Sequence, residues 1–255
     1  MSMEQTRAGF EESFAEGAFY NKQTQDEKHL QDIMTMLQVK PEMKILDLGC
    51  GSGYLTFAIA KACAKADVVG LDIVGHTLEQ NEKKAREEGL NNVSFVSYDG
   101  TTFPFEAEHF DLVVTRYALH HFPAIQSSIG EVARVLKPEG RFFISDPRPN
   151  DCDTTRFVDD YMRLKKDGHI KFYTKDEWIE ICGIHHMKLI DSFDSKIRFP
   201  KKMSTAEGYR DILTVHDRAI IDSYQLTETE DEIWITEQVN NLMFAKNREC
   251  GVFEQ

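Results

Sequence analysis

A glycine-rich turn follows the first apolar run of this 255-residue chain, and an acidic residue precedes it closely. The run from Met43 to Leu48 (MKILDL) contains Asp47 and leads into GCGSG at positions 49–53. Glycines at the carboxyl end of a strand let the backbone turn sharply and let a ligand approach closer than a Cβ would allow. The sequence therefore predicts a ligand site at this turn.

The spacing of these glycines argues against a dinucleotide ligand. The dinucleotide fingerprint G-x-G-x-x-G requires glycine at position 54, where this chain has Tyr54. The carboxylate of Asp47 would also repel a pyrophosphate, whereas it would attract a cationic ligand. A nicotinamide-dependent oxidoreductase stays an alternative, which stabilisation by NADH would favour.

Two further acidic residues end the next two predicted strands. Asp72 follows the apolar run at 68–71, and Asp99 follows the run at 93–98. An acidic side chain at the end of the second strand can accept hydrogen bonds from both hydroxyls of a ribose. Three carboxylates at successive strand ends, with few basic residues between them, predict a site for an uncharged or positively charged nucleoside, such as a sulfonium.

Strand-like and helix-like segments alternate through the first half of the chain. Strands are expected at 43–48, 68–71, 93–98, 110–115 and 141–145, and helices at 55–62, 77–89 and 125–136. Continuous apolar runs separated by helices indicate parallel strands that are buried on both faces. We expect an α/β fold, a Rossmann-like doubly wound three-layer sandwich with a seven-stranded, mostly parallel sheet and helical N-terminal and C-terminal cap elements.

The remaining segments are expected to cover this core. Thr77 with Gln80, and Thr174 with Glu177, have the spacing of a helix capping box. Other segments predict a helix at 23–37, strands at 188–193 and 239–245, and helical structure over 203–232. We expect a single domain over residues 1–255, with a cofactor-binding core at about 40–146 and cap or substrate elements at 1–39 and about 147–235.

The charge of the chain excludes several classes of partner. It carries 43 acidic residues against 30 Lys and Arg, a formal net charge of −13. Binding to nucleic acid needs a basic face, so we expect no nucleic-acid partner. The N-terminus lacks the apolar core of a secretory signal, and no apolar run approaches the roughly 18–20 residues of a membrane span. We expect a cytoplasmic protein without integral membrane association, and the oligomeric state is not readable.

Several strings together resemble the class I S-adenosylmethionine-dependent methyltransferases. They are LDLGCGSG at 46–53, LDI at 71–73, YDG at 98–100, FDLVVTRYALHHF at 110–122 and EVARVLKPEG at 131–140. The resemblance is to the small-molecule branch that includes the ubiquinone and menaquinone biosynthesis enzymes (methyltransferase type 11-like). It implies S-adenosyl-L-methionine as cofactor, S-adenosyl-L-homocysteine as product and a small-molecule acceptor, aromatic or quinone-like.

The resemblance also implies which residues surround the cofactor. The methionine end of the cofactor would face Asp47, Gly49, Cys50, Gly51 and Gly53. The ribose would face Asp72, and the adenine would face Ile73, Asp99 and Gly100. Arg116 and Tyr117 would border the site. Nucleic-acid methyltransferases usually carry [DNS]-P-P-[YF] after the fourth strand. This chain has TRYA at 115–118 there, which also favours a small-molecule acceptor.

The adjacent pair His120-His121 is the candidate general base. A sulfonium methyl group is already activated, so the enzyme must mainly hold the acceptor in line and ensure that it is deprotonated. A histidine pKa near 6.5 suits that task at neutral pH. The alternative is structural, with one histidine capping the helix near Pro123 and the other packing under the loop. Adjacent side chains present different faces, so we expect no metal site.

Aromatic residues near the N-terminus, among them Phe19 and Tyr20, are spaced too irregularly for a core stripe. We expect them to form part of a lid over an apolar or aromatic acceptor, and a core role for them is the alternative. A further class of function also stays open. A cofactor-binding sensor or regulatory protein would keep the pocket without turnover.

Overall fold

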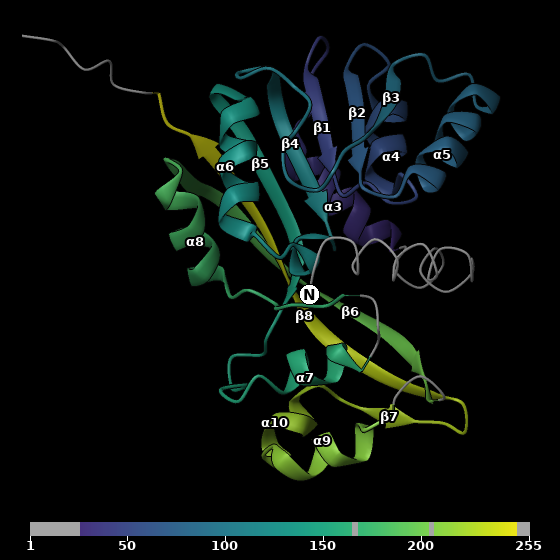
Figure 1. Cartoon of the computed structure of the whole chain (residues 1–255), viewed down its shortest axis with the longest axis vertical. Helices are drawn as coiled ribbons and strands as arrows, with labels where there is room; N and C mark the ends of the chain where they lie inside the picture. The colour runs from purple at the N-terminus through teal and green to yellow at the C-terminus, as the bar shows by residue number, and fades with distance from the viewer. Residues whose placement is uncertain (1–25, 165–167, 204–206, 249–255) are drawn as a thin grey trace, which may run out of the picture.

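One sheet organises the chain. The computed structural model describes residues 26–164, 168–203 and 207–248. Five strands pair in parallel, and two long strands extend the sheet antiparallel in the order β3-β2-β1-β4-β5-β8-β6, with β7 pairing β8 (Figure 1). The strands are β1 (Lys44–Leu48), β2 (Asp67–Asp72), β3 (Val93–Ser97), β4 (Phe110–Arg116), β5 (Leu136–Arg148), β6 (Met187–Lys202), β7 (Thr227–Glu228) and β8 (Glu232–Lys246).

Helices cover both faces of this sheet, which confirms the predicted three-layer arrangement (Figure 1). On one face, α3 (Glu27–Leu37) and α4 (Tyr54–Ala62) bury Ile33 and Ile59 against Ile45 of β1, and α5 (Gly75–Glu87) packs beside α4. On the other face, α6 (Ile125–Val135) and α8 (Lys175–Ile184) pack Val132 and Trp178 against the sheet. Ile45 packs on one face of β1 and Leu46 and Leu48 pack on the other, which explains why apolar residues follow one another in this strand.

A second lobe is built where β6 and β8 run on beyond the parallel strands (Figure 1). It contains α7 (Phe157–Arg163), α9 (Tyr209–Val215), α10 (Arg218–Ser223) and β7. Its own apolar cluster includes Phe157, Tyr161, Phe172, Tyr224, Ile233 and Ile235. Because β6 and β8 belong to both lobes, the cap is fixed to the core by continuous backbone ladders. No helix of the described residues is long and apolar enough to cross a membrane.

Several local expectations are corrected. The box at Thr77 and Gln80 is wrong, because α5 begins at Gly75 and its N-cap Val74 makes no side-chain bond. The box at Thr174 and Glu177 is confirmed in full. The strands expected at 188–193 and 239–245 are much longer in the structure, where they are β6 and β8. The segment 203–232, expected to be helical, contains two short helices, β7 and the start of β8. The sheet has eight strands instead of seven because β7 joins it.

Candidate functional site

The glycine turn after β1 leaves no room for a side chain at Gly49 or at Gly53. Gly49, Gly51 and Gly53 all have positive φ, at 68°, 48° and 78°. A Cβ on Gly49 would lie 2.6 Å from Cβ of Ala118, and one on Gly53 would lie 2.6 Å from the ring of Phe57. Real Cβ atoms do not approach so closely, so glycine is required at both positions. The turn therefore presents bare backbone at the carboxyl end of the sheet.

Asp72 ties this turn to the end of β2. Its Oδ2 accepts a hydrogen bond from the N–H of Gly51 at 2.8 Å, and its Oδ1 accepts one from the N–H of Val74 at 3.0 Å. The side chain is buried, which raises the pKa of the carboxyl, while the backbone hydrogen bonds, led by that from Gly51, oppose the rise. Each oxygen keeps a second lone pair for another donor.

Asp47 places a second buried carboxyl beside the same turn. It accepts a hydrogen bond from Oγ1 of Thr56 at 2.6 Å. Its pKa is raised to about 6, mainly by burial; the hydrogen bonds from Thr56 oppose the rise, and the charge of Asp72 adds to it. Two acids that disfavour each other's charge stabilise a cation placed between or beside them. Two buried carboxyls, Asp47 and Asp72, therefore lie beside the turn.

The other predicted cofactor residues divide between side-chain and backbone roles. The side chain of Cys50 is buried in the cluster with Phe57 and Phe95, so this residue offers only its backbone to the turn. Ile73 is half-buried at the end of β2. Asp99 is exposed, and hydrogen bonds from the side chain of Thr101 and from the N–H groups of Thr101 and Thr102 lower its pKa. Gly100 beside it has φ 88°.

Arg116 and Tyr117 border the site at the end of β4. The guanidinium of Arg116 lies 4.5 Å from the ring centroid of Tyr54 and 4.0 Å from that of Tyr117. Tyr117 adopts φ 55°, an uncommon conformation for a bulky residue, and burial raises the pKa of its hydroxyl to about 12.

The two candidate histidines occupy a short 3-10 helix, Leu119–His121, and both are buried. Nδ1 of His120 is 2.9 Å from Oδ1 of Asp146 on β5, and the two histidine rings have centroids 4.0 Å apart. Neither histidine caps the following helix, since its N-cap is Ala124 with no side-chain bond. The structure therefore brings His120 into a buried His–Asp pair at the junction of core and cap.

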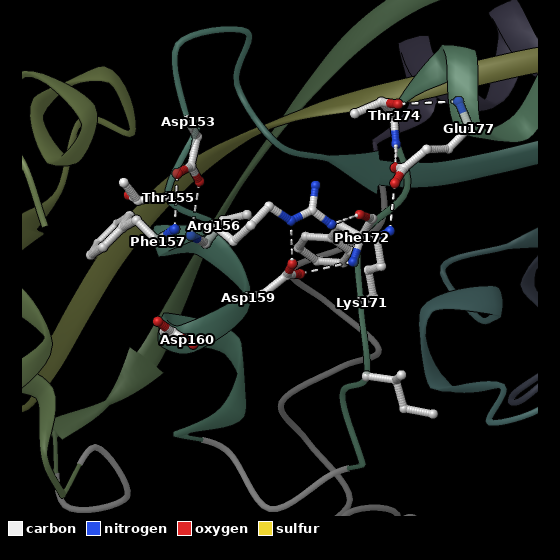
Figure 2. Close-up of polar contacts among 12 residues, drawn as sticks. Asp153, Thr155, Arg156, Phe157, Asp159, Asp160, Lys171, Phe172, Thr174 and Glu177 are labelled. Atoms are coloured by element: carbon white, nitrogen blue, oxygen red, sulfur yellow. Dashed lines mark hydrogen bonds and ion pairs between the residues drawn. The ribbon is translucent and has the colours of Figure 1, made fainter.

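A second buried His–Asp pair, which the sequence did not indicate, lies beside the first. Nε2 of His169 is 2.9 Å from Oδ1 of Asp159 on α7, and the rings of His169 and His120 have centroids 5.5 Å apart. Figure 2 shows Arg156 donating to Oδ2 of Asp159 at 2.8 Å and to the carbonyl of Phe172. Burial raises the pKa of Asp159, but its hydrogen bonds outweigh burial, so the net shift is downward.

This network closes the cap over His120. The N–H of Phe172 donates to Asp159 at 2.8 Å, and the N–H of Ile170 donates to the carbonyl of His120 at 2.9 Å. Farther along the same segment, Lys171 pairs with Glu177 of the α8 capping box (Figure 2). Residues 169–177 are therefore held by α7 on one side and by α8 on the other, directly against the 3-10 helix.

Glu237 is the most unusual group at this junction. It lies on β8 and is fully buried, and neither of its carboxylate oxygens has a hydrogen-bond partner among the described residues. Its pKa is raised to about 8, mainly by burial; the charge of Lys201 opposes the rise, and the charges of Asp146 and Asp159 contribute to it. A sequence signal existed, because Ile233, Ile235 and Val239 alternate as buried residues of the strand and Glu237 occupies a position in that series.

The methyltransferase domain family has a model that matches residues 39–181. The chain belongs to this methyltransferase family. It is 32% identical over 142 residues to the uncharacterized methyltransferase YcgJ of Bacillus subtilis, 55% of each chain. It is 37% identical over 100 residues to a demethylmenaquinone methyltransferase of Lactococcus lactis, 39% of this chain and 40% of that one. The matches thus span about half or less of these curated relatives.

Solved structures show the same methyltransferase fold. The crystal structure of YcgJ superposes with a TM-score of 0.75 at 24% identity, covering 87% of this chain and 99% of that one. Phosphoethanolamine N-methyltransferase 2 of Haemonchus contortus, in complex with S-adenosyl-L-methionine, superposes with a TM-score of 0.60 at 17% identity, covering 87% and 53%. The predicted family and fold class are confirmed.

The remaining predicted site residues lie outside the described structure. Phe19 and Tyr20, expected in a lid, fall within residues 1–25. The other predicted residues of this methyltransferase lie at or just after the carboxyl ends of three strands. Asp47 and the glycine turn are at the end of β1, Asp72 is at the end of β2, and Arg116, Tyr117 and the two histidines are at or after the end of β4. Sequence reasoning missed His169, Asp159 and Glu237, which the cap contributes.

Replacing Glu237 by Gln is expected to stabilise the protein, and increasingly so at higher pH. The folded-state pKa of about 8 lies above the ordinary value of 4.5, so between these values the unfolded chain binds fewer protons here and stability falls as pH rises. The gain in melting temperature of Glu237→Gln over wild type should therefore grow from about pH 5 to about pH 8 and then level off.

Circular dichroism melting curves measure this difference, with Glu230→Gln as a matched control at an exposed position. The control should shift the melting temperature little at any pH. A stabilisation by Glu237→Gln that does not change with pH would contradict the assignment of a raised pKa to Glu237.

Proposed function

We propose that this chain transfers a methyl group from S-adenosylmethionine to a small-molecule acceptor that is aromatic or quinone-like. The observation that carries the proposal is the pair of buried carboxyls, Asp47 and Asp72, beside a turn whose glycines leave the backbone bare. The strand ends of about 40–146 would bind the cofactor, and the cap of about 147–235 would bind the acceptor.

The residues at the strand ends fit this cofactor. Each oxygen of Asp72 uses one lone pair on backbone N–H groups, which leaves a lone pair on each for the hydroxyls of a ribose. The charges of Asp47 and Asp72 favour a positively charged sulfonium near the turn. Ile73 offers an apolar side chain, and Asp99 offers a carboxylate, at the ends of β2 and β3 for an adenine.

The bound cofactor supplies a methyl group on a positively charged sulfur, and the residues of the chain hold the acceptor and receive its proton. Asp146 holds Nδ1 of His120 at 2.9 Å, which favours the tautomer with a proton on Nδ1 and leaves Nε2 as an acceptor. We therefore assign the base to His120, with His121 next to it in the same 3-10 helix.

Two observations support the acceptor class. Aromatic rings lie at the core–cap junction: the ring centroid of Phe172 is 4.9 Å from that of His120, and Tyr117 directly follows the end of β4. The Lactococcus lactis relative is named for its action on demethylmenaquinone. A planar apolar acceptor would pack on such rings with its reactive atom close to the histidine pair.

Methyl transfer itself is tested with radiolabelled S-adenosylmethionine and a cell metabolite extract. The label is expected in an organic-soluble product, because the acceptor is small and apolar. Label only in protein or RNA would overturn the acceptor class. Tight cofactor binding without any labelled product would favour a sensor or regulatory protein.

Removing the carboxylate of Asp72 is expected to weaken cofactor binding. Asp72→Ala loses charge-assisted hydrogen bonds, an effect on the order of 1–3 kcal/mol, or about 5- to 150-fold in affinity. Isothermal titration with S-adenosylhomocysteine measures the change. Asp67→Ala, at the exposed start of the same strand, is the matched control and should bind normally. Equal affinity of the two variants would remove Asp72 from the cofactor site.

Removing the base is expected to slow transfer without affecting the cofactor. His120→Ala should lower the rate constant of transfer about 10²- to 10⁴-fold while leaving the affinity for S-adenosylhomocysteine intact. His76→Ala, on the exposed face of α5, is the control, and His121→Ala is measured in parallel. A larger loss in His121→Ala than in His120→Ala would transfer the role to His121, and an undiminished rate in both would exclude a histidine base.

A further inference from the structure

The cap contacts His120 at both its backbone and its ring. The carbonyl of His120 accepts hydrogen bonds from the N–H groups of Ile170 and Lys171, at 2.9 and 3.4 Å. The centroid of its imidazole ring lies 4.9 Å from that of Phe172 and 5.5 Å from that of His169. This short stretch of the cap therefore fixes where the backbone of His120 lies and packs on its side chain.

One carboxylate, that of Asp159 on α7, holds this stretch in place. Its Oδ1 accepts hydrogen bonds from the N–H of Phe172 at 2.8 Å and from Nε2 of His169 at 2.9 Å. Its Oδ2 accepts one from Nε of Arg156 at 2.8 Å, and Arg156 also donates to the carbonyl of Phe172 (Figure 2). Asp159 is buried, and both of its oxygens are used. Together, Asp159 and Arg156 hold the N–H and the carbonyl of Phe172.

The helix that carries Asp159 has a different carboxylate at its own N-terminal end. The N–H groups of Phe157 and Val158 donate to Asp153, at 2.9 and 3.0 Å. Figure 2 shows the two acids side by side in this role, with Asp153 bonded to the start of α7 and Asp159 bonded to Phe172. Two of the three donors to Asp159 come from the stretch that contacts the histidine. Its carboxylate therefore acts on that stretch rather than on the end of its own helix.

We propose that Asp159 is a positioning residue for methyl transfer, which keeps the imidazole of His120 oriented so that Nε2 receives the proton of the acceptor. The proposal rests on the function proposed above and adds a residue of the cap to the His120–Asp146 pair. Asp146 fixes Nδ1 of the ring, while the stretch that Asp159 holds fixes the carbonyl and packs on the ring. A displacement of about 1 Å can cost about 10²-fold in rate, so a residue that acts only through position can control transfer.

Nitrogen NMR of protein labelled at histidine tests the position of His120 without any turnover. The signals of His120 are assigned by their loss in His120→Gln, and in wild type they should report one tautomer, with the proton on Nδ1. In Asp159→Ala, which loses three hydrogen bonds, they should shift and report a mixture of tautomers. Asp160→Ala is the matched control, because Asp160 is the next residue of α7 and pairs with Arg163 and His216. It should leave the His120 signals unchanged.

A double-mutant cycle shows whether Asp159 acts through His120. The rate is measured with radiolabelled S-adenosylmethionine and one cell metabolite extract. Asp159→Ala is expected to lower the rate of transfer about 10- to 100-fold and to leave the affinity for S-adenosylhomocysteine intact. In a His120→Ala background the same substitution should change the rate less than about twofold, because the group that it positions is gone. A role limited to folding of the cap would lower the rate in both backgrounds.

A second variant, Asp159→Asn, keeps the size of the side chain and one oxygen acceptor. It should shift the His120 signals and lower the rate in the same direction as Asp159→Ala but less, and it replaces that variant if melting curves show Asp159→Ala to be unfolded. Unchanged His120 signals, an undiminished rate, or an equal loss of rate with and without His120 would each overturn the proposal. Failure of S-adenosylhomocysteine to bind, or the absence of any labelled product with wild type, would instead contradict the proposed function.

Discussion

The site depends on one pair of hydrogen bonds, those that the carboxylate of Asp72 accepts from Gly51 and Val74. They join the glycine turn after β1 to the end of β2, so that two separate strands share one rigid edge. Gly49 has no alternative, because any Cβ there would meet Ala118. The carboxylate that accepts these two hydrogen bonds is also the one to which the proposed function assigns the ribose of the cofactor.

The second constraint is the continuity of β6 and β8 from the core into the cap (Figure 1). These strands fix α7 and the segment 169–177 against the 3-10 helix that carries His120 and His121. Near that helix, Asp146 of β5 and Asp159 of α7 are each bound to a histidine. Glu237 of β8 has no hydrogen-bond partner among the described residues, and it faces the other side of the strand from Asn240, the register partner of Asp146. An unpaired buried carboxyl costs stability, which is the kind of cost that functional sites carry.

Much of the cofactor half could be predicted from the sequence, because its signals are local. Apolar runs indicated the strands β1 to β4, glycines indicated the turn, and the acidic residue at the end of β2 indicated Asp72, which is hydrogen-bonded to the turn. The cap gave weaker signals for physical reasons. Most residues of β6 are exposed or partly buried, and the first half of β8 alternates between partly buried and buried residues, so only short apolar stretches stood out. The helices α9 and α10 are too short to show a helical period. His169 and Glu237 matter through contacts distant in sequence, although Glu237 interrupts an alternating apolar series.

A co-crystal structure with S-adenosylhomocysteine tests the central claim most directly, because that claim is about position. The account predicts the ribose hydroxyls within hydrogen-bond distance of Asp72, with the sulfur beside the turn at 49–53 and facing the His120–Asp146 pair. A ligand bound elsewhere, or one whose ribose makes no contact with Asp72, would contradict it.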